Sequence, residues 1–304
     1  MTALSAVMEE KMKEQKIKLN DGHSMPVMGL GVFMMEPDTC ERAIRQAFDD
    51  GYRLIDTANS YMNERAVGRA MKASGLKREE ICLTTKIMPI DFGYEKTRLA
   101  IDATLKRLNT PYIDLLLLHI RFGDYMGAWK ALEEAVKEGR VKSIGISNFN
   151  EKEILDIAEH GTILPAVDQI ECHPYFQQKK MRAFLKQYDI QAESWFPIGH
   201  GSQKLLNDPL LLHLAEKYDR TLVQIILRWH VQEGLIPLPK AVDPVHLKEN
   251  IHIFDFHLED KDMEKIENLD TGRSFFQDEY DRESEAERAA EYLNIEHPDY
   301  DSQK

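Results

Sequence analysis

The chain has few cysteines and no long apolar stretches, and both features limit the classes of protein to which it can belong. Its 304 residues include three cysteines, whose spacing fits neither a disulfide framework nor a metal site. A low, odd count is typical of a reducing compartment. No run of about 18 apolar residues occurs, so we expect no membrane span. Residues 1–15 lack the apolar centre of a secretory signal, so we expect a cytoplasmic protein.

Positive charge is scarce as well, because 39 Lys and Arg face 52 Asp and Glu, a net charge of −13. Nucleic-acid binding needs clustered basic charge, so we expect no nucleic-acid partner. No Gly/Ser- or Pro-rich linker divides the chain, which favours one domain at 16–275 between a polar arm at 1–15 and an acidic segment at 276–304. That last segment is interpreted as a solvated helix or tail, with a flap at the mouth of the functional site as the alternative.

The abundant signal is a regular alternation of short apolar runs and helical patterns. A hairpin over 16–28 is predicted first, with Asp21-Gly22 at its turn. The strand candidates that follow are 29–33, 52–56, 81–86, 113–119, 141–145, 166–170, 190–195 and 235–238. The helix candidates are 39–49, 64–71, 94–108, 125–136, 151–159, 178–187, 208–217 and 221–232. Eight such units predict an α/β fold, a closed (β/α)₈ TIM barrel, rather than an open sheet.

Three polar residues stand where three successive predicted strands end. Asp56, Lys86 and His119 lie 30 and 33 residues apart, the length of one strand-plus-helix unit. In a (β/α)₈ barrel these strand ends meet at one mouth, where functional groups gather. Tyr61 follows Asp56 by five residues and is placed to reach the same mouth.

These four side chains make up a proton donor with its supports. A Lys ammonium next to Tyr61 favours the phenolate and is expected to lower the phenol pKa from about 10. Asp56 would hold Lys86 charged and oriented. Tyr61 would then give a proton to a carbonyl oxygen that becomes an alkoxide, while His119 bonds the same oxygen.

At these residues the sequence resembles the aldo-keto reductase family. The resemblance runs from about residue 16 to 270 and is closest to the bacterial short-loop group, the diketogluconate reductase-like and glyoxal reductase-like enzymes. The matching blocks are Gly51–Ala58 with Tyr61–Glu64, Thr84–Lys86, Leu116–His119, Gly145–Phe149 and Gln169–Tyr175. The predicted hairpin and Gly29-Leu30-Gly31 also match the start of the family's sequences. No Gly-x-Gly-x-x-Gly follows a strand, which is consistent with a family that binds its nicotinamide cofactor without a Rossmann domain.

The resemblance implies an oxidoreductase that passes a hydride from NADPH or NADH to the carbonyl carbon of a small aldehyde, ketone or dicarbonyl. It assigns Tyr61 as general acid, tuned by Lys86 and Asp56, and His119 as the residue that orients the substrate. For the nicotinamide half of the cofactor it implies contacts from Gly31, Val32, Ser147, Asn148, Gln169 and Trp195, of which Trp195 would stack on the ring.

For the adenosine half the resemblance implies contacts from Lys240, Ala241, Val242, Asp243, His246, Glu249 and Asn250. The family commonly has Ser, a hydroxyl residue and Arg where this chain has Ala241, Asp243 and His246. Losing a hydroxyl and a bidentate cation weakens recognition of a 2′-phosphate. Asp243 would repel that phosphate and accept from a ribose 2′-hydroxyl instead. The alternative is that Lys240 and His246 suffice while Asp243 faces solvent.

Four residues are expected to line the substrate pocket: Phe33, Met88, Ile120 and Arg121. The family often has aromatic residues at the first three positions, so we expect an apolar but less aromatic pocket. Arg121 is interpreted either as a site for a substrate carboxylate or phosphate, or as a surface cation paired with Asp124. The expected partner is a small carbonyl compound, with the protein a monomer or weak homo-oligomer.

Two other kinds of protein stay open at this point. One is a cofactor-binding regulatory subunit with the same fold and weak catalysis, against which the intact Asp56, Tyr61, Lys86 and His119 argue. The other is an unrelated barrel hydrolase or lyase that uses a metal. We expect no metal, because no tight cluster of His, Asp and Glu ligands is evident.

Overall fold

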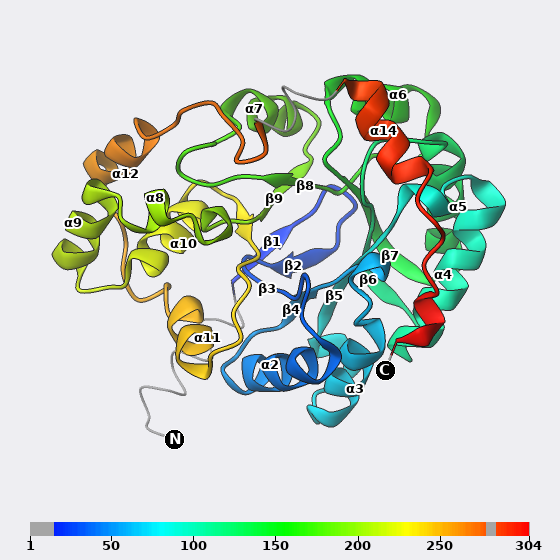
Figure 1. Ribbon diagram of the computed structural model, residues 1–304, viewed down its shortest axis with the longest axis horizontal. Coiled ribbons are helices and arrows are strands. Elements are labelled where there is room, and N and C mark those ends of the chain that lie inside the picture. Colours follow the sequence, from blue (N-terminus) through cyan, green and yellow to red (C-terminus); the bar gives the residue numbers. More distant parts are fainter. Residues whose placement is uncertain (1–14, 278–283, 304) are drawn as a thin grey trace.

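A computed structural model describes residues 15–277 and 284–303, and these residues form a barrel closed at one end by a hairpin. The hairpin pairs β1 (Lys16–Lys18) with β2 (Ser24–Pro26) in antiparallel register, Ile17 opposite Met25. In Figure 1 it lies across the ring of strands. The hairpin is therefore confirmed, whereas the arm predicted at 1–15 falls outside the described part of the chain except for its last residue.

Eight parallel strands make up the sheet, in the unbroken order β10-β9-β8-β7-β6-β5-β4-β3. Their bounds are β3 (Leu30–Gly31), β4 (Leu54–Asp56), β5 (Cys82–Ile87), β6 (Ile113–Leu118), β7 (Val141–Ser147), β8 (Val167–Glu171), β9 (Gln191–Trp195) and β10 (Ile236–Pro237). The two outer strands meet at a seam, where the amides of Gly29 and Gly31 donate to the carbonyls of Pro237 and Pro239 at 3.2 and 3.1 Å. The (β/α)₈ fold predicted from the sequence is confirmed.

Helices surround the sheet, as Figure 1 shows. They are α2 (Pro37–Asp49), α3 (Glu64–Ala73), α4 (Tyr94–Leu108), α5 (Tyr125–Lys137), α6 (Glu151–His160), α7 (Lys179–Gln187), α8 (Gln203–Leu206), α9 (Pro209–Tyr218), α10 (Leu222–Gln232), α11 (Pro244–Ile251), α12 (Asp260–Glu267) and α14 (Glu285–Leu293). Short 3₁₀ turns lie at Asn59–Tyr61, Arg78–Glu80, Pro89–Asp91, Gly199–Gly201 and Tyr300–Ser302. The sequence did not predict α8, α11 and α12. Within residues 15–277 and 284–303, no helix has the length and apolar character that crossing a membrane requires.

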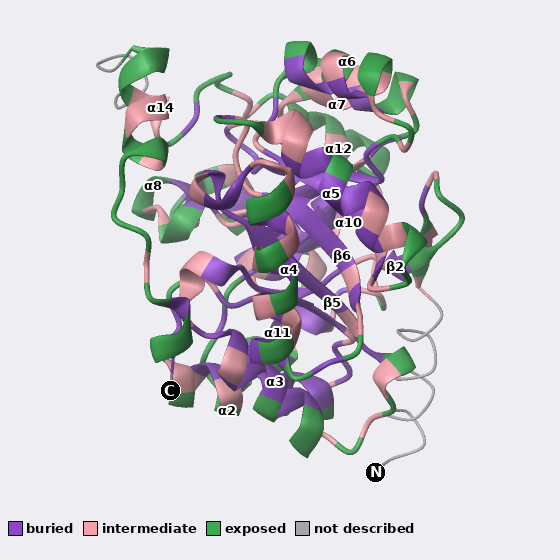
Figure 2. Ribbon diagram, turned by 90° about the vertical axis from the view of Figure 1, so that its right-hand side faces the viewer, coloured by how far each residue is buried: buried purple, intermediate pink, exposed green. Residues whose placement is uncertain are grey.

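The barrel interior is apolar at the hairpin end and polar at the other end. Its apolar layer gathers side chains from the strands and the hairpin: Leu19, Met25, Leu54, Leu115, Leu117, Val167, Ile236 and Leu238. A second, larger core fills the space between sheet and helices. Figure 2 shows this buried centre, with the hairpin on one side and α14 on the other. Each fully buried Leu or Ile contributes roughly 1.5–3 kcal/mol to folding. Because the hairpin region contributes Leu19 and Met25 to this layer, it stabilises the barrel by covering the apolar end of its interior.

Residues 284–303 of the acidic C-terminal segment pack along the outside of the barrel. The helix α14 begins with a capping box between Ser284 and Glu287. Tyr292 stacks on Phe122 with ring centroids 5.9 Å apart. Nearer the end, the ring of Tyr300 is buried. The described part of this segment is thus a helix with a docked end.

Candidate active site

Asp56, Lys86 and Tyr61 converge at the carboxyl end of the barrel. Lys86 is fully buried on β5, and its ammonium donates to both carboxylate oxygens of Asp56 at 2.7 Å and to the carbonyl of Thr57 at 2.9 Å. It also lies 3.4 Å from the hydroxyl of Tyr61. Strand register explains the convergence, because β4 and β5 are neighbours that end at the same rim.

A buried amide shapes the turn that carries Tyr61. Asn63 donates to the carbonyls of Val32 and Met35 at 2.9 and 3.3 Å, and accepts from the hydroxyl of Thr57 at 2.7 Å. Met62 takes the left-handed conformation, with φ 57°. These contacts hold the 3₁₀ turn at Asn59–Tyr61 over the end of β4, so that the phenol faces Lys86.

Burial changes the expected electrostatics of the proton donor. Burial raises the pKa of Tyr61 above its ordinary value, and Lys86 lowers it only in part. The expectation of a lowered phenol pKa is therefore wrong for this structure, because desolvation of the phenolate outweighs the ammonium. For Lys86, burial lowers the pKa, but Asp56 and Tyr61 together hold it above its ordinary value. The pair is a charged ammonium and a protonated phenol.

His119 follows β6, and its ring meets that of Tyr61 in a T-shaped contact, with centroids 5.7 Å apart. Burial, and then the charge of Lys86, lower the pKa of this imidazole well below its ordinary value, so the ring is neutral. Its buried Nδ1 has no hydrogen-bond partner in the described part of the chain. A neutral ring beside a phenol is suited to bond an uncharged substrate oxygen.

Four residues predicted to hold the nicotinamide lie together at the ends of β7, β8 and β9. The hydroxyl of Ser147 donates to the carbonyl of Gln169 at 3.0 Å. Asn148, in the left-handed region with φ 59°, donates to Ser147 Oγ at 3.0 Å. Trp195 donates its indole N–H to Asn148 Oδ1 at 2.8 Å. The structure thus brings these residues to the same rim as Tyr61.

Gly31 and Val32 lie on the opposite side of the mouth. Val32 is fully buried, and its amide donates to the carbonyl of Asp56 at 3.0 Å. A Cβ added to Gly31 would lie 3.0 Å from the carbonyl oxygen of Leu238. Close approach across the seam thus gives a structural reason for glycine here.

The segment predicted to bind the adenosine half leads from β10 into α11. Asp243 caps this helix, and its Oδ1 accepts from the amide of Val245 at 2.7 Å. Lys240 donates to the carbonyl of Met34 at 3.3 Å. The side chains in this segment divide by exposure: Val242, Asp243 and His246 are exposed, Glu249 is half-buried, and Ala241 and Asn250 are buried.

A chain of aromatic contacts begins at the phenol of Tyr61 and continues away from it, so the mouth is more aromatic than expected. Phe33 meets Tyr61 edge to face at 4.9 Å, and Phe196 meets Phe33 at 6.0 Å. Phe276, which comes from the C-terminal segment, contacts both Phe196 and Trp195. Sequence reasoning missed Phe196 and Phe276, because their place at the mouth depends on contacts between residues far apart in the sequence. Of the remaining predicted pocket residues, Met88 is buried directly after β5, and Ile120 is half-buried after His119.

Arg121 has different partners from the one expected. Its guanidinium lies 3.2 Å from Glu285 of α14 and 3.8 Å from Glu153. Asp124, the expected partner, instead caps α5 by accepting from the amide of Gly127 at 2.9 Å. The predicted surface pair with Asp124 is therefore wrong, since helix capping occupies that carboxylate.

Sequence reasoning missed a buried carboxylate, Glu193 of β9. Gln169 donates from one amide nitrogen to Glu193 at 2.7 Å and to Asp56 at 2.9 Å. The signal was present in the alternation along residues 191–195, which turns Glu193 inward together with Trp195. A carboxylate in the interior of a barrel strand needs a reason, because burial disfavours its charge.

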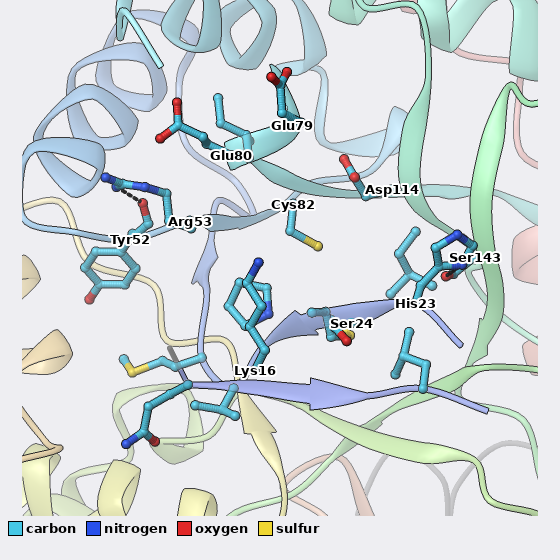
Figure 3. A pocket seen from close by; sticks show the side chains of 18 of the residues that line it. Lys16, His23, Ser24, Tyr52, Arg53, Glu79, Glu80, Cys82, Asp114 and Ser143 are labelled. Atoms are coloured by element: carbon cyan, nitrogen blue, oxygen red, sulfur yellow. Dashed lines mark hydrogen bonds between the residues drawn. The ribbon is translucent and has the colours of Figure 1, made fainter. Parts of the chain in front are cut away.

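A cavity of about 330 Å³ lies at the other end of the barrel, between the hairpin and the strand starts. Figure 3 shows the side chains of Lys16, His23 and Cys82 around it. The cluster described above lies at the opposite ends of these strands. Among the residues that the structure describes, no group of three or more His, Cys, Asp or Glu side chains is arranged to hold a metal ion.

Comparison with known proteins places this site in a family context. The profile described as "Aldo/keto reductase family" matches residues 27–271. Morphine 6-dehydrogenase of Pseudomonas putida is 42% identical over 274 residues, 86% of this chain and 93% of that protein. Glyoxal reductase of Bacillus subtilis is 40% identical over 255 residues, 83% and 92%. A crystal structure of an aldo-keto reductase from Bombyx mori in complex with NADP superposes with a TM-score of 0.81 at 31% identity, covering 85% of this chain and 93% of that one.

Proposed function

Because this chain belongs to the aldo/keto reductase family, we propose that it reduces the carbonyl group of a small aldehyde, ketone or dicarbonyl, with Tyr61 as the proton donor. The observation that carries this proposal is the contact of Tyr61 with a buried, charged Lys86, which is itself held by Asp56. Support also comes from relatives, one of them named a glyoxal reductase.

The residues at the mouth fit a nicotinamide cofactor, NADPH or NADH. Gln169 donates its amide nitrogen to the side-chain oxygens of Asp56 and Glu193, which leaves its carbonyl oxygen to accept from the cofactor's carboxamide. Ser147 and Asn148 offer further polar atoms at the same place, and Trp195 supplies a flat face. When bound, the cofactor supplies a hydride to the carbonyl carbon. The NADP complex of the Bombyx mori relative agrees with this proposal.

The protein's own part in the reaction is to orient the carbonyl and to supply a proton. The neutral ring of His119 donates to the carbonyl oxygen and fixes its direction. As the carbon gains the hydride, the oxygen takes the proton of the Tyr61 hydroxyl and an alcohol forms. The phenolate left behind lies next to the ammonium of Lys86, which stabilises it until a proton from water restores the phenol.

Direct assay tests this proposal. We expect the purified protein to oxidise NADH or NADPH when methylglyoxal or a simple aromatic aldehyde is added, followed by cofactor absorbance. Cofactor binding without reduction of any carbonyl would contradict it and favour the regulatory-subunit alternative, which nothing in the site geometry supports at present.

We propose further that the enzyme uses NADH as well as NADPH. Asp243 places a carboxylate at the start of α11 and takes the amide of Val245. Because a helix N-terminus attracts anions, a carboxylate already there competes with a cofactor phosphate. We expect Asp243→Ser to raise kcat/KM for NADPH relative to NADH by about tenfold. A ratio that does not move would overturn the role of Asp243.

A further inference from the structure

The unexplained feature of the mouth is the second buried carboxylate, Glu193. It is fully buried on β9, directly opposite Gln169 in the register of β8 and β9. Through the amide of Gln169 it is joined to Asp56 on the far strand β4. One of its oxygens, Oε1, has no hydrogen-bond partner in the part of the chain that the structure describes. Asp56 alone already neutralises Lys86, so Glu193 is not needed to hold that ammonium.

We propose that Glu193 is a positioning residue for the reduction: it anchors the amide of Gln169 and brings a second, ionisable carboxyl group to the Tyr61–Lys86–Asp56 cluster. This proposal rests on the function proposed above. The hydrogen bond to Glu193 fixes the orientation of the Gln169 amide. Its nitrogen donates to Glu193 and Asp56, so only its carbonyl oxygen remains to accept from a cofactor carboxamide. The ionisable group sets the charge that the phenol of Tyr61 feels.

The charges around Glu193 decide when it ionises. Asp56 on β4 repels a second negative charge, while Lys86 on β5 attracts it. Cys82, also on β5, is a neutral thiol, because burial raises its pKa well above the ordinary value. Burial, and then Asp56, raise the pKa of Glu193 to about 8, against the lowering effects of Gln169 and Lys86. Glu193 therefore keeps its proton to a higher pH than an ordinary glutamic acid does, and it becomes negative in the alkaline range.

Ionisation of Glu193 acts on Tyr61. Burial raises the pKa of Tyr61 most. Among the charged groups, Lys86 lowers this pKa, and Asp56 and then Glu193 raise it. His119 also faces the phenol but carries no charge. Once Glu193 is negative, removing the proton of Tyr61 becomes harder. As a result Tyr61 keeps its proton to a higher pH than it would with a neutral residue at position 193.

Two substitutions separate the charge of Glu193 from its hydrogen bond. Glu193→Gln keeps an acceptor for Gln169 and removes the charge. We expect its cofactor KM to stay within twofold of the parent value, while the alkaline fall of kcat for reduction moves about one unit to lower pH. Glu193→Asp keeps the charge but withdraws it by one methylene. We expect its pH profile to stay in place and its cofactor KM to rise about fivefold.

The control is Asp168→Asn, a change of a second buried acid one residue before Gln169, whose side chain faces away from the barrel interior. Its pH profile should match that of the parent enzyme. An alkaline limb that is unmoved in Glu193→Gln, or that moves equally in Asp168→Asn, overturns the proposal. If Glu193→Gln does not fold, a cofactor KM of Glu193→Asp within twofold of the parent value overturns it. Absence of any reduction by the parent protein would instead refute the proposed function.

Discussion

The two ends of the barrel each hold an Asp, a Lys and a Tyr, yet only one end has the marks of a reaction centre. At the mouth these are Asp56, Lys86 and Tyr61, and the ammonium approaches the phenol hydroxyl. At the hairpin end Lys142 donates to Asp114 at 2.9 Å and lies 4.1 Å from the ring centre of Tyr112. The same three residue types therefore do not define a site by themselves.

The difference lies in burial and in how many partners share the carboxylate. Asp114 also accepts from Arg78 at 2.6 Å and from the amide of Leu83 at 3.1 Å, and the side chain of Lys142 is 37% exposed. Lys86 is fully buried, and Nδ1 of its neighbour His119 has no hydrogen-bond partner among residues 15–277 and 284–303. The cluster around Asp114 uses its polar atoms for contacts that stabilise the fold. The cluster around Lys86 and His119 keeps a polar atom that can form a hydrogen bond with a substrate.

The same substitution at both ends gives the sharpest test. We expect Tyr61→Phe to lower kcat for carbonyl reduction by about 10³-fold, because a general acid is lost, with the cofactor Kd unchanged within twofold. Tyr112→Phe should leave kcat within twofold. Turnover is measured by cofactor absorbance and binding by fluorescence titration. Near-normal turnover in Tyr61→Phe would refute its role as proton donor.

An Asp→Asn pair extends the comparison to stability. Asp114→Asn should lower the free energy of unfolding by roughly 1–3 kcal/mol, because two cations and a backbone amide lose a charged acceptor. It should leave kcat/KM unchanged. Asp56→Asn should lower kcat/KM by more than tenfold, since Lys86 loses its counter-ion. Denaturant unfolding and steady-state kinetics on both variants check this, and equal loss of activity in the two would remove the distinction between the ends.

A third aspartate, on the outer face of β8, belongs to neither end. Asp168 is fully buried, and burial raises its pKa well above the ordinary value, with the amide of Phe149 lowering it only in part. The folded state therefore binds more protons than the unfolded state above about pH 4, so stability falls as pH rises. We expect Asp168→Asn to raise the free energy of unfolding at pH 7 by roughly 1–3 kcal/mol and to flatten its pH dependence, measured by denaturant unfolding from pH 4 to 8. An unchanged pH dependence of the free energy of unfolding in Asp168→Asn would contradict the raised pKa of Asp168.

The sequence predicted the elements whose signals are local. The helix at 94–108 was predicted with the bounds it has in the structure, since apolar spacing alone defines it. The helix α11 was missed although Asp243-Pro244 is a good helix start, because that segment was interpreted only by its resemblance to a cofactor site. Asp56, Lys86 and His119 were placed at one mouth from strand spacing, and the structure brings them there.

What the sequence did not predict depends on contacts between distant residues. The bond from Gln169 to Asp56 spans 113 positions, and no local pattern reports it. Desolvation of Tyr61 is likewise a property of the whole mouth, so the direction of its pKa shift was predicted wrongly from Lys86 alone. Arg121 was assigned to its near neighbour Asp124, but Glu285 reaches it from a segment over 160 positions away.

The seam between β3 and β10 has a mechanical consequence. Proline has no amide hydrogen, so Pro237 and Pro239 can only accept hydrogen bonds across the seam. The seam therefore has fewer backbone hydrogen bonds than the strand pairs inside the sheet. Hydrogen exchange should therefore reach the amides of Gly29 and Gly31 before those of β5 to β7. The segment at 238–243 continues from this seam. A ligand that binds across the seam would therefore hold β3 and β10 together, and the protein's resistance to unfolding would rise with the fraction of protein that has ligand bound.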